Sequence, residues 1–175
     1  MKKAVFLDRD GTINEDRHYV HTPENFVFLP GVPEAICLIR QKCYLVIVAT
    51  NQSGVARGYF PESDVIKLHE YMQSELKKLG ACADSIYYCP HLPDASIKDY
   101  AKVCRCRKPG PEMFECGLSE FDVDPVQSYA VGDKLRDLEP GKILGMKTAL
   151  ISQKKCLSRI ADAIYPSLYD FAVSI

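Results

Sequence analysis

Two carboxylates one residue apart, Asp8 and Asp10, follow a short apolar run near the start of the chain. Residues 4–7 are typical of a buried strand, and Gly11 ends that run in a turn. Because side chains alternate along a strand, both acids point the same way if the extended geometry continues. Such a pair could hold a divalent cation, or one acid could attack a phosphorus atom while the other moves protons. Alone, the motif is equally compatible with an acid-rich turn.

Three further segments could complete a site around these acids. In chain order they are the apolar run 45–49 followed by Thr50 and Asn51, the pair Arg107-Lys108 before Pro109, and the run 129–131 followed by Gly132-Asp133 and then Asp137. This ordered set resembles the haloacid dehalogenase superfamily over roughly residues 4–151. Four ordered motifs are far more specific than any one of them.

The elements that must position these residues alternate between strand and helix patterns, which favours a parallel sheet with helices on both faces. The resemblance implies a Rossmann-like three-layer α/β/α fold with a mainly parallel sheet in strand order 5-4-1-2-3, and no cap domain. The predicted strands are 4–7, 45–49, 85–88, 128–131, 147–151 and 163–165, and a short strand is expected at 26–29 inside a flap of residues 13–30. The predicted helices are one from 32 to about 43, then 62–79, 112–120, one that Asp137 caps with Pro140 in its first turn, and a last one after Ser167.

Length and charge bound the function classes. The chain has 175 residues and suits one domain, 1–175, interpreted as a single haloacid dehalogenase-like phosphatase domain. A net charge of −1 provides no strong field toward nucleic acid or an anionic membrane. The sequence contains no apolar run long enough to span a bilayer and no secretion signal pattern at its N-terminus. We therefore expect a cytoplasmic protein with no nucleic-acid or membrane partner, and nothing demands more than a monomer.

Eight cysteines divide into two groups, and in a reducing compartment none is expected in a disulfide. The scattered ones, predicted to be small buried apolar residues, are Cys37, Cys43, Cys82, Cys116 and Cys156. The remaining ligand-type residues are Cys89, His91, Cys104 and Cys106, within 18 residues. Three thiolates and an imidazole suit a closed tetrahedral Zn²⁺ site with a structural role. The alternative is two reduced cysteine pairs beside an unrelated histidine.

The zinc loop, residues 89–106, sharpens the resemblance. Its sequence, together with 19–21, 50–58 and 132–134, resembles the D-glycero-D-manno-heptose-1,7-bisphosphate 7-phosphatase family. Histidinol-phosphate phosphatases share the fold, the four motifs and a similar zinc loop, so zinc does not separate the two families. Because Arg107 and Lys108 follow Cys106 directly, a metal in this loop would deliver both cations to the active site.

The resemblance implies a role for each catalytic residue. Asp8 is the nucleophile that forms an aspartyl-phosphate, and Asp10 is the general acid and base. Mg²⁺ would be held by Asp8, the backbone carbonyl of Asp10, and Asp133. Thr50 and Lys108 would stabilise the transferring phosphoryl group. The alternatives are a strand-end turn residue for Thr50 and a solvated surface lysine for Lys108, although the position of each residue favours the functional role.

Other polar residues concern the substrate. We expect the amide of Asn51 to bind the phosphoryl group. Arg107, whose planar fork suits phosphate, is expected either to recognise a second phosphate at C1 or to help close the pocket over the sugar. His21, in the flap, could contact sugar hydroxyls. The weaker candidates are Lys134, which could pair with the carboxylate cluster, and Arg57, which could simply cover the next helix. His18 and His69 are predicted at the surface. Asp137 either supports the metal site or caps the following helix.

The leading hypothesis is a Mg²⁺-dependent phosphoric monoester hydrolase in lipopolysaccharide biosynthesis. It would remove the C7 phosphate of a heptose bisphosphate, a small-molecule substrate, and yield heptose 1-phosphate. Histidinol phosphate is the alternative substrate, because the flap carries charges of both signs. A zinc-stabilised binding module with a vestigial site is the non-enzyme alternative, although no motif residue is missing. A nucleic-acid 3′-phosphatase is disfavoured by the balanced charge.

Overall fold

A six-stranded parallel sheet forms the centre of the computed structural model, which describes residues 1–154 and 158–175. Its strands are β1 (Lys3–Leu7), β2 (Tyr44–Asn51), β3 (Ser85–Cys89), β4 (Tyr129–Gly132), β5 (Lys147–Ile151) and β6 (Ala163–Tyr165). They lie in the order β3-β2-β1-β4-β5-β6, and each neighbouring pair is parallel. This order confirms the predicted 5-4-1-2-3 arrangement and adds the sixth strand beside β5. Because both faces of the sheet are covered, its central strands are nearly continuous apolar runs.

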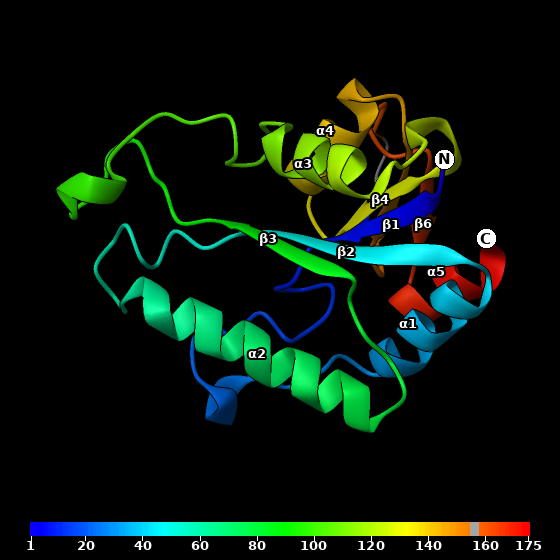
Figure 1. Cartoon of the computed structure of the whole chain (residues 1–175), viewed down its shortest axis with the longest axis horizontal. Helices are drawn as coiled ribbons and strands as arrows, with labels where there is room; N and C mark the ends of the chain where they lie inside the picture. The colour runs from blue at the N-terminus through cyan, green and yellow to red at the C-terminus, as the bar shows by residue number, and fades with distance from the viewer. Residues whose placement is uncertain (155–157) are drawn as a thin grey trace.

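Helices cover both faces of the sheet, which confirms the three-layer fold. They are α1 (Val32–Gln41), α2 (Glu62–Lys78), α3 (Glu112–Phe121), α4 (Leu135–Ile143) and α5 (Leu168–Ser174), with short 3-10 turns at Pro23–Asn25, Lys98–Tyr100 and Pro125–Gln127. Figure 1 shows α1, α2 and α5 on one side of the sheet and α3 and α4 on the other. Among the described residues no helix could cross a membrane and no cap domain is inserted.

Two helix boundaries differ from the predictions. Helix α1 ends at Gln41, so Cys43 does not share its apolar face and instead adopts a left-handed backbone with φ of +63°. Helix α4 begins before Asp137, because that side chain accepts a hydrogen bond from the Lys134 backbone N–H as the acid of a capping box. Pro140 therefore lies inside the helix rather than in its first turn.

The flap of residues 13–30 has less regular structure than expected. The predicted strand at 26–29 is wrong, because only Phe28 forms a bridge, an isolated antiparallel one with Asn14. The Phe26 side chain is instead buried in the core on the α1 and α2 side, with its ring centroid 5.0 Å from that of Phe28. The Phe26 ring also lies 6.0 Å from that of Tyr71 on α2, and Ile13 and Val20 are buried in the same core, so side-chain packing attaches the flap to the domain.

The scattered cysteines are not the buried apolar residues that were predicted. Among the described ones, Cys43 and Cys116 are exposed, and Cys37 and Cys82 are partly exposed. Cys156 lies outside the described residues. Thiols are small enough for helix ends and turns, so their apolar character alone does not determine burial.

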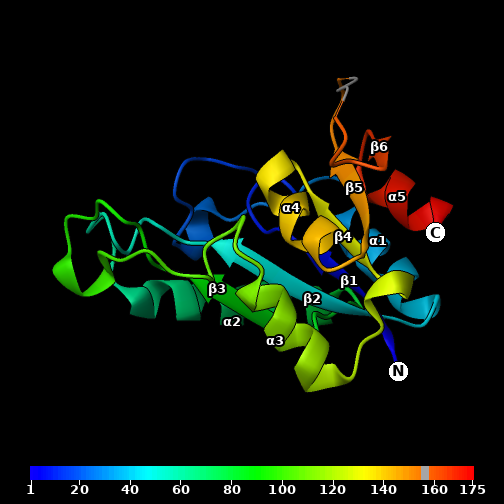
Figure 2. The same ribbon diagram turned by 90° about the horizontal axis from the view of Figure 1, so that it is seen from above.

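The loops at the carboxyl ends of the strands form the functional end of the molecule. Figures 1 and 2 show the segment after β3 and the flap projecting from this end, while both chain termini lie at the opposite end of the sheet. Helix α4 approaches β4 closely, since a Cβ on Gly141 would overlap the Cβ of Ala130. Strand β4 is the parallel neighbour of β1, so the turn that carries Asp133 lies beside the end of β1.

Candidate active site

Three carboxylates meet where β1 and β4 end. Asp8 follows β1, Asp133 follows β4, and Asp137 comes from α4; one oxygen of each lies within 4.8 Å of the others. Adjacent parallel strands bring their carboxyl ends together, which explains this meeting of distant residues. A Cβ on Gly11, whose φ is +89°, would lie 2.6 Å from Asp133 Oδ2, so only glycine permits the approach.

A buried lysine crosses this cluster. Lys108 is 3% exposed, and its Nζ lies 2.7 Å from Asp8 Oδ1 and 2.8 Å from Asp137 Oδ1. The solvated surface lysine considered from the sequence is therefore wrong. Burial disfavours the ammonium, but the charges of Asp8 and Asp137 raise the pKa of Lys108 above its usual range. The other oxygen of Asp137 caps α4 from inside its first turn, and its predicted support of a metal site stays a prediction.

The carboxylate cluster fits a hard divalent cation. Burial raises the pKa of Asp8 to about 7; Lys108 opposes this shift, while Asp137 and Asp10 add to it. Asp133 Oδ1 is buried without a hydrogen-bond partner, which leaves a lone pair free for a metal. Carboxylate oxygens are the ligands that Mg²⁺ prefers, and a bound cation would favour the ionised acids. The carboxylate of Asp10 lies outside this three-acid group, so its predicted metal contact, through the backbone carbonyl, stays a prediction.

Strand β2 provides the neighbouring polar groups. Thr50 is 1% exposed, and its Oγ1 accepts a hydrogen bond from Gln52 Nε2 at 2.9 Å. The Asn51 side chain pairs with the Lys108 backbone, because it accepts from the Lys108 N–H at 2.9 Å and donates to the Lys108 carbonyl at 3.0 Å. Asn51 thus attaches the segment after the cysteine loop to the end of β2. Its predicted contact with substrate stays a prediction.

A second polar network, centred on Asp10, was not predicted from the sequence. Arg9, Asn14 and Gln52 all donate to its carboxylate. The guanidinium of Arg9 also lies 3.1 Å from His69 Nε2. His69 is 7% exposed, so its predicted surface location is wrong. The signal was available, because His69 lies four residues after Val65 on the apolar face of α2.

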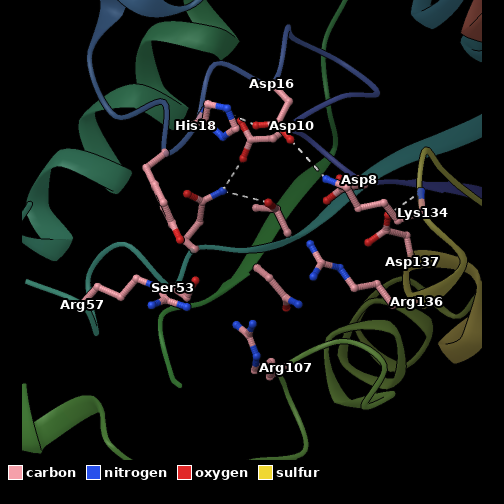
Figure 3. A pocket seen from close by; sticks show the side chains of 14 residues that line it. Asp8, Asp10, Asp16, His18, Ser53, Arg57, Arg107, Lys134, Arg136 and Asp137 are labelled. Carbon is pink, nitrogen blue, oxygen red and sulfur yellow. Dashed lines mark hydrogen bonds and ion pairs between the residues drawn. The ribbon is translucent and has the colours of Figure 1, made fainter. Parts of the chain in front are cut away.

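Four cations surround the pocket above these acids. They are Arg57, Arg107, Lys134 and Arg136, and the same pocket is lined by Asp8, Asp10, Thr50 and Asn51. Figure 3 shows Arg107 and Arg136 extending toward the pocket from two different elements. The Arg136 side chain was missed by the sequence analysis, although it follows the Gly132-Asp133 motif closely.

The flap closes one side of this pocket. Asp16 pairs with Lys134 at 3.1 Å, and Lys134 also lies 3.6 Å from Asp133, which confirms its expected pairing with the carboxylates. Arg57 lies over the Tyr19 ring at 5.9 Å. His21 stacks on Phe60, with centroids 4.3 Å apart. His21 is not among the residues that line the pocket, so its predicted contact with substrate stays a prediction.

The Cys/His loop forms a compact cluster of soft ligands. The Sγ atoms of Cys89, Cys104 and Cys106 lie 3.0–3.5 Å apart, and His91 Nδ1 lies 3.3 Å from Cys106 Sγ. Burial and the neighbouring Cys106 and Cys104 thiols raise the pKa of Cys89. One atom from each of the four residues lies within 4.8 Å of the others, a set that could bind a tetrahedral metal.

His69 gives a testable pH dependence of stability. Burial, with a smaller contribution from Arg9, lowers the pKa of His69 from 6.5 to about 3, so only the unfolded chain takes up its proton between these values. The free energy of unfolding should therefore decrease as the pH drops below 6.5. At pH 5 this residue alone should lower it by about 1–2 kcal/mol. Urea unfolding at pH 7.5 and 5.0 should show this loss in the wild type and not in His69→Gln. Equal losses in both proteins would contradict it.

Comparisons with known proteins agree with this site. A family model described as HAD-hydrolase-like matches residues 105–168. A D-glycero-beta-D-manno-heptose-1,7-bisphosphate 7-phosphatase from Haemophilus ducreyi is 45% identical over 97% of this chain and 96% of its own. The protein of the same name from Escherichia coli K12 is 42% identical over 85% of this chain and 78% of its own.

A solved structure shares the fold throughout. The D,D-heptose 1,7-bisphosphate phosphatase from B. bronchiseptica, crystallised with magnesium and phosphate, superposes with a TM-score of 0.85 and 34% identity. The match covers 98% of this chain and 96% of that one. The motifs, the sheet order and this degree of identity agree. The chain belongs to the D-glycero-beta-D-manno-heptose-1,7-bisphosphate 7-phosphatase family of haloacid dehalogenase-like hydrolases.

Proposed function

We propose that this protein is a Mg²⁺-dependent phosphatase that removes the C7 phosphate of D-glycero-β-D-manno-heptose 1,7-bisphosphate and yields heptose 1-phosphate. The observation that carries the proposal is Asp8, a buried carboxylate at a strand end, paired with Lys108 and beside two further acids. The names of the relatives support the substrate and its β anomer. The product would serve lipopolysaccharide biosynthesis.

The chemistry follows from the two acids of the first motif. The Asp8 carboxylate attacks phosphorus and the bond to the C7 oxygen breaks, while Asp10 gives its proton to that oxygen. Asp10 then takes a proton from the water that attacks the aspartyl-phosphate, and inorganic phosphate leaves as Asp8 is regenerated. Lys108, already bonded to Asp8, and Thr50 stabilise the charge that develops on the phosphoryl oxygens.

A divalent cation would complete the site. Asp8, Asp133 and the backbone carbonyl of Asp10 are the proposed Mg²⁺ ligands, and the unpartnered Asp133 Oδ1 supports this assignment. Mg²⁺ supplies positive charge that lets an anionic nucleophile approach a phosphate dianion. The Asp137 carboxylate is already committed to Lys108 and to the cap of α4, so we assign it a supporting role.

The charges of the pocket favour a bisphosphate over histidinol phosphate. The acids that line the pocket, Asp8, Asp10, Asp16 and Asp137, are each paired with a lysine or arginine. The cations of the pocket are Arg57, Arg107, Lys134 and Arg136, of which Lys134 pairs with Asp16. A second phosphate would be attracted by this set, whereas the protonated amine of histidinol phosphate would be repelled. We assign Arg107 to the distal C1 phosphate, because its planar fork can bind two oxygens at once.

The site and its supports come from one chain. Its residues span positions 8 to 137 and come from β1, β2, β4, α4 and the loops that follow them. Residues 1–175 are proposed to act as a single domain and as a monomer. We propose that it acts in the cytoplasm on this small sugar phosphate.

Phosphate release with Mg²⁺ tests the proposed function. The β anomer of heptose 1,7-bisphosphate should be hydrolysed with a kcat/KM at least about 100-fold above that for histidinol phosphate, and Asp8→Asn should reduce turnover by about 10⁴-fold or more. Cys116→Ser, at an exposed thiol, should leave the rate unchanged. Preference for histidinol phosphate would overturn the proposed substrate and leave the proposed reaction unchanged. A wild type that is no faster than Asp8→Asn would favour the binding-module alternative.

Arg107→Met tests recognition of the second phosphate. Loss of a charge-assisted, bidentate contact should raise KM for the bisphosphate by about 10- to 100-fold. With heptose 7-phosphate, which has no second phosphate, KM should change by less than about 3-fold. Arg105→Met is the matched control, because Arg105 is paired with Glu115 on an exposed surface. An equal rise in KM for both substrates would show that Arg107 does not distinguish them.

Zinc analysis tests the Cys/His cluster. We propose a structural Zn²⁺ held by Cys89, His91, Cys104 and Cys106, since four protein ligands leave no open position for catalysis. Purified protein should contain one zinc per chain by elemental analysis. Cys104→Ser should lose most of it, with a fall in melting temperature of about 5 °C or more. The Cys82→Ser control should retain both the zinc and the melting temperature of the wild type. Protein that is fully active and free of zinc would support the alternative of reduced cysteine pairs.

A further inference from the structure

Arg9 is the most deeply buried charged side chain near the site. Its side chain is 0% exposed, although it lies between the two acids of the first motif. A buried guanidinium is costly unless it is paired and its N–H groups are satisfied. In this structure the N–H groups of Arg9 have hydrogen-bond partners on four different segments of the chain. The reaction scheme above gives Arg9 no role.

The first partner is the carboxylate of Asp10. Arg9 Nη2 donates to Oδ1 at 3.0 Å and to Oδ2 at 2.9 Å, and Nε lies 3.2 Å from Oδ1. Asn14 Nδ2 donates to Oδ1 at 3.0 Å and Gln52 Nε2 donates to Oδ2 at 3.0 Å. Both oxygens of Asp10 are thus held from several directions, and the carboxylate has little freedom to rotate.

The other partners hold Arg9 itself. Its Nη2 donates to the Val20 carbonyl of the flap at 2.8 Å and lies 3.2 Å from Gln52 Oε1. Its Nη1 lies 3.1 Å from His69 Nε2 on α2. Arginine has only donors, so His69 must accept, and an imidazole that burial keeps neutral can do so. Arg9 is therefore anchored to the flap, to the segment after β2 and to α2.

We propose that Arg9 is a positioning residue that orients Asp10 for its two proton transfers. The inference rests on the proposed function, in which Asp10 first protonates the C7 oxygen and then deprotonates water. Both steps need one carboxyl group within hydrogen-bond reach of two different oxygens in succession. A displacement of about 1 Å can cost about 100-fold in rate, so a rigid support has a direct effect on catalysis.

A double-mutant cycle separates this role from a purely structural one. Arg9→Lys keeps the charge but loses the fork, and should lower kcat by about 30- to 100-fold with little change in KM. In an Asp10→Asn background the same substitution should change kcat by less than about 3-fold, because the group it orients is absent. Equal losses in both backgrounds would overturn the proposal. Arg40→Lys, at a partly buried arginine paired with Asp84, is the matched control.

A burst experiment gives a second, independent readout. With p-nitrophenyl phosphate the leaving group departs as p-nitrophenolate and needs no proton, so Arg9→Lys should still release one equivalent of it rapidly. Turnover should then be slow, since water attack on the aspartyl-phosphate needs a placed base. The wild type should show a smaller burst. A variant in which both phases slow in proportion would show a structural role only.

Variants of His69 test the positioning role of Arg9 even if Arg9→Lys does not fold. His69→Phe removes the acceptor and should lower kcat by about 3- to 10-fold only when Asp10 is present, whereas His69→Gln, which restores an acceptor, should recover most of it. A wild type no faster than Asp8→Asn would contradict the proposed function. An active wild type with unchanged kcat in His69→Phe and equal Arg9→Lys losses would contradict the positioning role alone.

Discussion

Burial of Lys108 between Asp8 and Asp137 is the constraint on which the rest of the structure depends. Its ammonium is almost fully removed from solvent, and either carboxylate without it would be an uncompensated buried charge. The three residues come from the segment after the cysteine loop, from the end of β1 and from α4. The fold must therefore bring these three distant regions close enough for Lys108 Nζ to lie within hydrogen-bond distance of both carboxylates. The close approach of Gly11 to Asp133 and the two hydrogen bonds between the Asn51 side chain and the Lys108 backbone hold these regions together.

The two acids of the first motif sit in different environments, although they are one residue apart. Asp8 faces a lysine and two further acids in a space that fits a cation, whereas Asp10 is held by neutral amides and a buried guanidinium. Different surroundings are what allow two identical side chains to act in one reaction as nucleophile and as proton carrier. The fold produces the difference through the turn that follows the end of β1 at Leu7 and through the flap, which contributes the Val20 carbonyl to the Arg9 network.

The sequence predicted most of the fold, because apolar runs and helix signals mark the strands and helices of a parallel α/β sheet directly. It also indicated Asp8, Asp133 and the Cys/His ligands, whose residue types and spacings carry chemistry. It failed where partners come from distant segments. The contact of Arg9 with His69 joins residues 60 positions apart, and no local pattern specifies it. Helix α4 was misplaced because Asp137 was interpreted as the first capping residue, when it is the acid that caps from inside the first turn.

The positions of the chain termini have a practical consequence. Both lie at the end of the sheet remote from the strand ends that carry the pocket, and the N-terminal amine is held 3.7 Å from Asp122 at that remote end. An affinity tag, a fused carrier or a surface tether attached at either terminus would thus extend away from the substrate entrance. The protein can be immobilised through either end in an orientation that leaves the pocket open to solution.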